Sequence, residues 1–359
     1  MKLGGTIVDH LLKQKELDRR EKLRKEKPLV YEKVIKFDEK VARGESIAIL
    51  QVQYNYACNF RCNHCSVKNM QIHHGSALRK LTPSDIADLC KQADDFGLAR
   101  FEINGGEPLI NTDLEELVTA INPEKFYINL VTNGWFLDDK KAEYLKRIGI
   151  DRIQVGIDSL DAEEHDEFRN KIGSHKKAIN AVDACIKAGL DVFVTTVVTK
   201  QRLYTNEFMD FVKFFNEKGV GVFITYAKPV GAWEGNFDAM VNEEDLAYAR
   251  ELEKTHNVFS HLTSAYNIPS RCLAVCGLVG ITQYGDVMPC QYLFIKLGNI
   301  FEEPLKDILE RGMKLKPFHT HTCPIAADKD FVNNYIVPNV YGKTLPVPYQ
   351  EVFNKEDME

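Results

Sequence analysis

The sequence predicts an α/β protein with a parallel sheet, because strand patterns and helix patterns alternate regularly along it. From residue 47 onward, short apolar runs alternate with amphipathic stretches, which is typical of parallel strands joined by right-handed helical crossovers. The chain has 359 residues and 44% hydrophobic content, enough for a large core. Its nine cysteines include two groups that are far apart in the sequence. We therefore expect a large α/β unit followed by a smaller metal-binding unit.

The expected elements follow from local signals. Strands are expected at residues 47–54, 101–104, 126–132, 152–157, 191–198 and 219–226. Helices are expected at 82–96, 111–121, 137–147, 161–188 with a break near Gly173, and 204–217. The first of these helices has a clear start, since Thr82 is an N-cap residue and Pro83 follows at the first helical position. Ligands of parallel sheets bind at the carboxyl ends of the strands, so functional residues are expected there.

The first cysteine group lies just after the first expected strand. Cys58, Cys62 and Cys65 have the spacing C-x3-C-x2-C. Thiolates are soft ligands for iron, zinc or copper(I), and three of them in one loop can wrap a metal centre. Three local thiolates leave one coordination position for a ligand that is not protein. The alternative is a structural zinc whose fourth ligand is a nearby histidine, namely His64, His73 or His74.

The second signal is the sequence Gly105-Gly106-Glu107-Pro108, which follows the strand expected at 101–104. Two glycines let a backbone approach a ligand closely. The carboxylate of Glu107 and the carbonyl groups beside Pro108 supply hydrogen-bond acceptors. This stretch suits an ammonium group, and a zinc site alone leaves it unexplained.

Together, the two motifs resemble those of the radical S-adenosylmethionine (radical SAM) enzymes. The resemblance implies a partial (β/α)6 TIM-like barrel that contains the six expected strands. It implies a 4Fe-4S cluster held by Cys58, Cys62 and Cys65, with the fourth iron chelated by the amino and carboxylate groups of S-adenosylmethionine. Residues 105–108, that is Gly105, Gly106, Glu107 and Pro108, would contact the methionyl amino group. The implied reaction is reductive cleavage to a 5′-deoxyadenosyl radical, which abstracts a substrate hydrogen.

The same resemblance implies further cofactor contacts. His64 lies inside the cysteine motif and is assigned to the cofactor. Arg169 would pair with the methionyl carboxylate, and Asp158 with a ribose hydroxyl. Asn133 would contact adenosine or the substrate, although an asparagine that only forms a turn is an equal alternative. Gly156 occupies the usual serine position of the family, so no hydroxyl contact is expected there.

Substrate contacts are expected from the end of the sixth strand. In radical SAM enzymes the last strands often form the substrate face, and Lys228 and Trp233 follow the strand expected at 219–226. These two residues are the candidates for substrate binding.

Four cysteines form the second group, Cys272, Cys276, Cys290 and Cys323. A hairpin turning at Gly285-Asp286 would bring Cys290 beside the earlier two. This segment resembles the C-terminal SPASM extension of radical SAM enzymes, or its shorter relative twitch. No further cysteines follow Cys323, so the resemblance implies a single auxiliary 4Fe-4S cluster used for electron transfer. A structural zinc with four thiolate ligands is the alternative.

The predicted organisation has five parts: a charged helical segment at 1–45, the barrel at 46–235, a linker helix at 236–259, the auxiliary-cluster domain at 260–330 and a tail at 331–359. The first segment is interpreted as a solvated lid or brace, with a basic helix for an acidic leader peptide as the alternative. It is too short for a winged-helix peptide-recognition domain. The tail has the length to cover the mouth of the active site.

Composition restricts partners and compartment. The net charge of −6 argues against nucleic acid as the main partner. No apolar run reaches transmembrane length, and cysteine-rich metal sites suit a reducing compartment, so a cytoplasmic protein without membrane contact is expected. A flavodoxin or ferredoxin would be the reductant.

The resemblance favours oxidation, epimerisation or cross-linking of a peptide or protein. Two alternatives are a dehydrogenase or epimerase of a small sugar, aminoglycoside or cofactor precursor, and a non-catalytic iron-sulfur or zinc protein.

Overall fold

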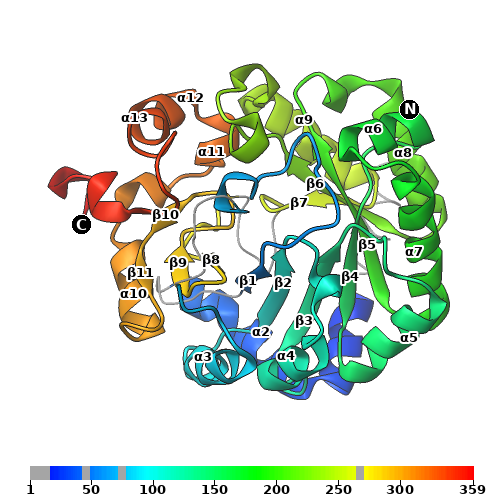
Figure 1. The fold of residues 1–359 in the computed structure, drawn as a ribbon, viewed down its shortest axis with the longest axis horizontal. Coiled ribbons are helices and arrows are strands. Elements are labelled where there is room, and N and C mark those ends of the chain that lie inside the picture. Colours follow the sequence, from blue (N-terminus) through cyan, green and yellow to red (C-terminus); the bar gives the residue numbers. More distant parts are fainter. Residues whose placement is uncertain (1–16, 43–48, 72–77, 264–270) are drawn as a thin grey trace.

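A computed structural model describes residues 17–42, 49–71, 78–263 and 271–359. Of the alternative zinc ligands, His73 and His74 lie outside these described residues. The expected fold class is confirmed: a mostly parallel, curved central sheet is flanked by helices (Figure 1).

The central sheet has ten strands in the order β11-β9-β8-β1-β2-β3-β4-β5-β6-β7. Strands β1 to β7 are parallel to their neighbours and follow the chain order. Their bounds are β1 Ile49–Asn55, β2 Arg100–Gly105, β3 Tyr127–Thr132, β4 Arg152–Gly156, β5 Asp191–Val198, β6 Gly221–Tyr226 and β7 Val258–Ser260. All six strands expected for the barrel are therefore present, within about two residues of their expected ends.

The helices between the strands cover the outer face of this sheet (Figure 1). They are α3 Pro83–Asp95, α4 Leu114–Ile121, α5 Asp139–Ile148, α6 Ala162–Arg169, α7 Ser174–Ala188, α8 Asn206–Glu217 and α9 Glu243–Thr255. Thr82 caps α3 in a capping box with Asp85, as its sequence signal indicates. The expected break near Gly173 separates α6 from α7, and Gly173 has a positive φ of 81°.

The segment before the barrel contacts the amino-terminal ends of the strands. Residues 17–26 are helical, and helix α2 spans Pro28–Ala42. Lys27 Nζ lies 2.5 Å from Asp151 Oδ2, just before β4. Lys33 Nζ lies 2.6 Å from Asp94 Oδ1 and 3.9 Å from the ring centroid of Phe126. These contacts match the brace interpretation, because the charged side chains attach the helices to the barrel.

The region after β7 extends the same sheet from its other edge. Strand β8 (Leu278–Ile281) is parallel to β1, while β9 (Asp286–Met288) and β11 (Gly298–Asn299) continue the sheet antiparallel. The expected hairpin is thus present, with Gly285 at a positive φ of 80°. The sheet runs without interruption through the expected boundary between barrel and auxiliary domain. Helix α10 (Leu305–Met313) follows β11.

The final segment packs on the core. It contains α11 Pro324–Ala327, α12 Lys329–Phe331, a π-helix at Val332–Ile336, α13 Val337–Asn339 and β12 Val347–Pro348, which pairs with β10 (Ile295–Lys296). Val332 and Ile336 are buried, and the Tyr341 hydroxyl donates to the carbonyl of Pro229 at 2.5 Å. The tail therefore contacts the loop that follows β6. No helix in the described ranges is both long and apolar enough to cross a membrane.

Candidate active site

One cavity of about 1320 Å³ reaches both cysteine groups. It exceeds the roughly 300–1,000 Å³ of an ordinary small-molecule site, so it has room for a cosubstrate and part of a substrate. Its walls include the three thiols of the first group and three of the second, namely Cys58, Cys62, Cys65, Cys272, Cys290 and Cys323. Among the other expected site residues, His64, Gly105, Gly106, Asn133, Arg169, Lys228 and Trp233 also line it.

The loop of the first cysteine group is attached to the end of β2 through backbone hydrogen bonds. Gly106 N donates to Asn55 O, and Glu107 N donates to Ala57 O, both at 2.8 Å. A Cβ on Gly105 would lie 2.2 Å from Asn55 O, and one on Gly106 would lie 2.1 Å from Ala57 O. Both glycines are required because two backbones touch here. The position of the cysteine loop thus depends directly on these glycines.

Glu107 is fully buried, and its carboxylate points away from the cavity, which neither it nor Pro108 lines. It accepts hydrogen bonds from Leu109 N at 3.0 Å, Thr132 Oγ1 at 2.7 Å and Asn133 N at 2.8 Å. Burial raises the pKa of Glu107, and these hydrogen bonds oppose the rise. The Glu107 carboxylate therefore connects the end of β2 to the end of β3 through hydrogen bonds and does not face a ligand.

Asn133 connects the end of β3 to the cysteine loop. Its Nδ2 donates to Asn59 Oδ1 at 2.9 Å, and its Oδ1 accepts from Trp135 N at 2.9 Å. Both ends of the amide are thus used, one in the turn expected for an asparagine before glycine and one in holding the loop.

Asp158 and Arg169 form a largely buried ion pair. Arg169 Nε lies 2.6 Å from Asp158 Oδ2, and the side chains are 12% and 4% exposed. Burial alone would raise the pKa of Asp158, but the Arg169 guanidinium outweighs it and holds that pKa well below its usual range. A Cβ on Gly156 would lie 2.7 Å from Arg169 Nη2. Glycine replaces the family's serine here because the guanidinium fills that space.

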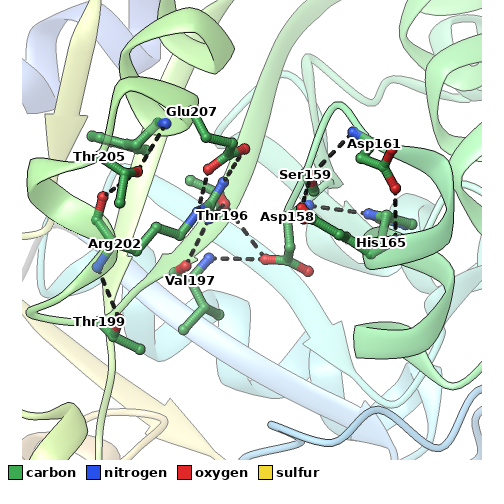
Figure 2. A network of polar contacts seen from close by, with 12 residues as sticks. Asp158, Ser159, Asp161, His165, Thr196, Val197, Thr199, Arg202, Thr205 and Glu207 are labelled. Atoms are coloured by element: carbon green, nitrogen blue, oxygen red, sulfur yellow. Dashed lines mark hydrogen bonds and ion pairs between the residues drawn. The ribbon is translucent and has the colours of Figure 1, made fainter.

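Figure 2 shows Asp158 within a wider polar network. Its Oδ1 accepts from Val197 N at 3.0 Å, and His165 Nδ1 accepts from Asp158 N at 3.1 Å. Arg202 continues the network through its 2.6 Å hydrogen bond to Thr196 Oγ1. Asp158 itself does not line the cavity. Its carboxylate holds Arg169 and the end of β5, so the ribose contact implied by the resemblance stays a prediction.

His64 and Trp233 form an aromatic wall with Phe168. The ring of His64 stacks on Phe168 at a centroid distance of 4.2 Å, and Trp233 lies 6.1 Å from His64. Burial lowers the pKa of His64 to about 4, so the imidazole is neutral at pH 7. Its Nδ1 is buried and has no hydrogen-bond partner in the described protein, which leaves it for a ligand.

The second cysteine group lies across the cavity, beside Lys228. Cys272 and Cys323 are buried. Burial lowers the pKa of Lys228, whereas negative charge on the nearby cysteine sulfurs raises it. Lys228 Nζ donates to Tyr226 O at 2.7 Å and lies 4.1 Å from the ring centroid of Tyr292. Cys276 does not line the cavity, and its sulfur accepts from Arg271 Nη2 at 2.9 Å.

The soft thiolates of the two cysteine groups are ligands that suit iron-sulfur clusters. Within the described part of the chain, no three His, Cys, Asp or Glu side chains converge closely enough to hold one ion. A tetrahedral zinc with Zn–S bonds near 2.3 Å needs sulfurs only about 3.8 Å apart. A 4Fe-4S cluster separates its ligands more widely, because each thiolate binds a different iron. Burial raises the pKa of all seven thiols, so metal binding must displace protons.

The sequence-based prediction missed the polar lining of the barrel interior. Amides and one carboxylate from β1, β2, β4 and the loop after β9 line the cavity, namely Gln51, Gln53, Glu102, Asn104, Gln154 and Gln291. Asn129 on β3 is buried and donates a hydrogen bond to Glu102. The available signal was the alternation of polar and apolar residues in these strands, as in Gln51-Val52-Gln53. Strands of a parallel sheet are normally apolar on both faces. Polar residues at alternate positions therefore indicate a binding interior.

Comparisons with known proteins agree with this arrangement. Residues 52–215 match the model of the radical SAM superfamily, and residues 272–329 match SPASM, an iron-sulfur cluster-binding domain. The chain thus contains a radical SAM domain followed by a SPASM domain. This enzyme family uses a 4Fe-4S cluster and S-adenosylmethionine, and the SPASM domain adds auxiliary iron-sulfur chemistry. The expected cofactors of this radical SAM enzyme are thereby confirmed, whereas the individual ligands stay predictions.

Curated relatives of this radical SAM enzyme act on small molecules, as their names state. A probable GTP 3′,8-cyclase of Methanosarcina mazei is 29% identical over 298 residues, covering 77% of this chain and 89% of the relative. An AdoMet-dependent heme synthase of Nitratidesulfovibrio vulgaris is 24% identical over 295 residues, covering 74% of this chain and 79% of the relative.

Solved structures share the fold. SuiB of Streptococcus suis has a TM-score of 0.59 at 18% identity, covering 76% of this chain and 68% of SuiB. The enzyme anSMEcpe with bound AdoMet and the Cp18Cys peptide has a TM-score of 0.55 at 19% identity, covering 74% and 80% of the two chains.

The contact between Gly106 and Ala57 yields a first prediction. In Gly106→Ala the new Cβ meets a backbone oxygen that cannot move without breaking the hydrogen bond from Glu107 N. We expect the variant to lose the first cluster, so that iron content falls from about eight to about four per chain. Iron and sulfide analysis after anaerobic reconstitution measures this. Gly219→Ala is the control: alanine is strained there by the positive φ of 77°, but nothing lies within 4 Å of its added Cβ. It therefore reports backbone strain without a clash, and equal iron in both variants would contradict the argument.

Proposed function

We propose that this radical SAM enzyme cleaves S-adenosylmethionine at Cys58, Cys62 and Cys65 and removes a hydrogen atom from a substrate bound between the two cysteine groups. The observation that carries the proposal is the single cavity, which three cysteines of each group line. When bound, a reduced 4Fe-4S cluster supplies the electron that splits S-adenosylmethionine into methionine and a 5′-deoxyadenosyl radical.

The protein's own residues would position the cosubstrate. Arg169 uses Nε to bind Asp158, so its two terminal nitrogens are directed toward the space beside Gly156. A guanidinium in this position suits the methionyl carboxylate. The backbone of residues 105–108 would receive the ammonium group, since the Glu107 side chain is turned inward. His64 would present its unpaired Nδ1 to the adenosine portion.

The second cysteine group would hold one auxiliary 4Fe-4S cluster through Cys272, Cys276, Cys290 and Cys323. Four thiolates ligate every iron of such a cluster and leave no iron for substrate. Its natural role is therefore electron transfer. The substrate would lose one hydrogen atom to the 5′-deoxyadenosyl radical, one electron to the auxiliary cluster and one proton to solvent. The net result is a two-electron oxidation, which yields an unsaturated or cross-linked product. A flavodoxin or ferredoxin would supply the first electron.

We propose a peptide or protein side chain as the substrate, because the cavity has room beyond the cosubstrate for a side chain with flanking backbone. The second candidate is a small polar molecule. The curated relatives favour it, since a GTP cyclase and a heme synthase align with this chain over most of their lengths. An oxidised peptide or an oxidised small molecule in the product mixture distinguishes the two.

The test of the proposed function uses the anaerobically reconstituted full chain. We expect about eight irons and eight sulfides per chain, and formation of 5′-deoxyadenosine when S-adenosylmethionine and dithionite are added. Four or fewer irons together with bound zinc would contradict the auxiliary-cluster assignment. A complete absence of 5′-deoxyadenosine from iron-loaded protein would contradict the catalytic assignment.

The Cys290→Ala variant distinguishes the roles of the two cysteine groups. The variant removes a thiol that lines the cavity on the side of Lys228 and Tyr292. We expect iron to fall from about eight to about four per chain, because one iron of the auxiliary cluster loses its ligand and, unlike at the first site, no S-adenosylmethionine would take that position. Product formation should fall at least about tenfold more than 5′-deoxyadenosine formation, since only the later electron transfer uses the second group. Parallel assays of both products measure the ratio. An unchanged ratio would exclude an electron-transfer role.

A further inference from the structure

Glu102 on β2 is a buried carboxylate inside the barrel. Its side chain lines the cavity, and the residue is 5% exposed. Among the described residues it has no ion-pair partner, and Arg100, two positions earlier on β2, has a buried Nε that makes no hydrogen bond to it. Removing an ionised carboxylate from water is costly unless a cation or several hydrogen bonds compensate. The groups around Glu102 therefore show which kind of ligand could compensate its charge.

Three neutral amides donate to Glu102. Gln51 Nε2 lies 2.8 Å from Oε1, Asn129 Nδ2 lies 2.9 Å from Oε2, and Asn104 Nδ2 lies 3.4 Å from Oε1. These residues come from β1, β3 and β2, which are adjacent in the sheet. A carboxylate only accepts hydrogen bonds, so each amide must turn its NH2 group toward it. The amide orientations are thereby fixed.

That orientation leaves the three amide carbonyl oxygens without partners. Gln51 Oε1, Asn104 Oδ1 and Asn129 Oδ1 are buried and have no hydrogen bond in the described protein. The three residues are 7%, 7% and 1% exposed. A buried acceptor without a donor costs about 1–3 kcal/mol. Of the three residues, Gln51 and Asn104 line the cavity together with Glu102, whereas Asn129 lies behind them. Two unpaired acceptors and one negative charge therefore belong to the cavity wall, and the group that suits them is rich in N–H donors and positively charged.

The site lies within reach of the proposed chemistry. Asn104 Nδ2 also donates to Gln291 Oε1 at 2.7 Å, and Gln291 is adjacent to Cys290 in the chain. Tyr292 follows in the chain and lines the same cavity as Glu102. Tyr292 also contacts Lys228 beside the second cysteine group. A group bound at Glu102 would thus lie close to Gln291 and Tyr292, which follow Cys290 of the second cysteine group in the chain.

We propose that Glu102 and the carbonyl oxygens of Gln51 and Asn104 bind a primary ammonium or guanidinium group of the substrate. The proposal rests on the proposed function, because it identifies the substrate class of the same cavity. A lysine or arginine side chain of a peptide has this chemistry, and so does a small amine. An ammonium has three N–H donors and a guanidinium has five, enough for the carboxylate and its neighbouring carbonyls.

Binding of cationic probes tests this site. The probes are N-acetyl-arginine amide and N-acetyl-lysine amide, compared with their neutral counterparts N-acetyl-citrulline amide and N-acetyl-norleucine amide. Saturation-transfer NMR titration on the anaerobic holoenzyme, with saturating S-adenosylmethionine and no reductant, gives the Kd values. We expect at least one cationic probe to bind about tenfold more tightly than its counterpart. No reductant is present, so the result does not depend on cleavage of the cosubstrate.

Variants make the assignment specific. Glu102→Gln removes the charge at nearly constant volume, and we expect the cationic preference to disappear. Glu116→Gln makes the same charge change on the exposed surface of α4 and should retain it. Gln51→Met removes one unpaired carbonyl without removing the charge, and should weaken cationic binding about three- to tenfold even if Glu102→Gln does not fold. Equal binding of neutral and cationic probes, or a preference that persists in Glu102→Gln, would overturn the proposal.

Discussion

Cys58→Ala is expected to abolish formation of 5′-deoxyadenosine, with a loss of at least about a thousandfold that reaches the assay background. The physical reason is that Cys58 and its two neighbours in the motif supply all protein ligands of the proposed first cluster. Two thiolates do not retain the cluster in a cavity open to solvent and oxygen. The auxiliary cluster would not replace it, because cysteines would ligate all its irons and leave none at which S-adenosylmethionine could bind. Iron should fall from about eight to about four per chain.

The matched control is another cysteine that the fold buries elsewhere. Cys185 lies in α7, is 0% exposed and packs in the core. Cys185→Ala removes one thiol and leaves a small cavity, so it should lower stability slightly while iron content and 5′-deoxyadenosine formation remain. If Cys58→Ala kept full iron and cleavage, the assignment of the first cluster to this loop would be wrong. Parallel loss in Cys185→Ala would instead show that the assay reports folding.

Arg169→Gln is expected to lower the free energy of unfolding by about 3 kcal/mol. Removing the guanidinium leaves the carboxylate of Asp158, 4% exposed, without its cation, and breaking a buried ion pair from one side typically costs about 3–5 kcal/mol. The 12% exposure of Arg169 places the expected value at the low end. Thermal unfolding of the anaerobic holoenzyme should show a decrease of roughly 4 °C in Tm.

A double-mutant cycle separates the pair from the cosubstrate contact. Asp158→Asn combined with Arg169→Gln removes both charges, so the double variant should be more stable than Arg169→Gln alone. Affinity for S-adenosylmethionine should nevertheless remain reduced about tenfold or more in the double variant, because the cation for the methionyl carboxylate is gone. Equal affinity in wild type and double variant would restrict Arg169 to a structural role. Additive losses of stability would show that the two side chains do not interact.

Three glycines illustrate which features could be predicted from the local sequence and which could not. Gly105 and Gly106 were expected to bring backbone close to a ligand, and their motif correctly indicated the family. The structure shows that both also allow the backbones of two neighbouring loops to touch. The sequence marks Gly156 only as a missing serine. The structure explains the glycine, because Arg169, thirteen positions later in the chain, occupies the space that a side chain at Gly156 would need.

The sequence alone determined the alternation of strands and helices, the two cysteine groups and the family to which they belong. These features depend on spacing within short segments, and a short segment carries that information itself. Only the tertiary structure decided that Glu107 turns inward, that Asp158 is engaged by Arg169, and that three amides from adjacent strands converge on Glu102. Such relations depend on the register and curvature of the sheet, which arise from the packing of residues far apart in the chain.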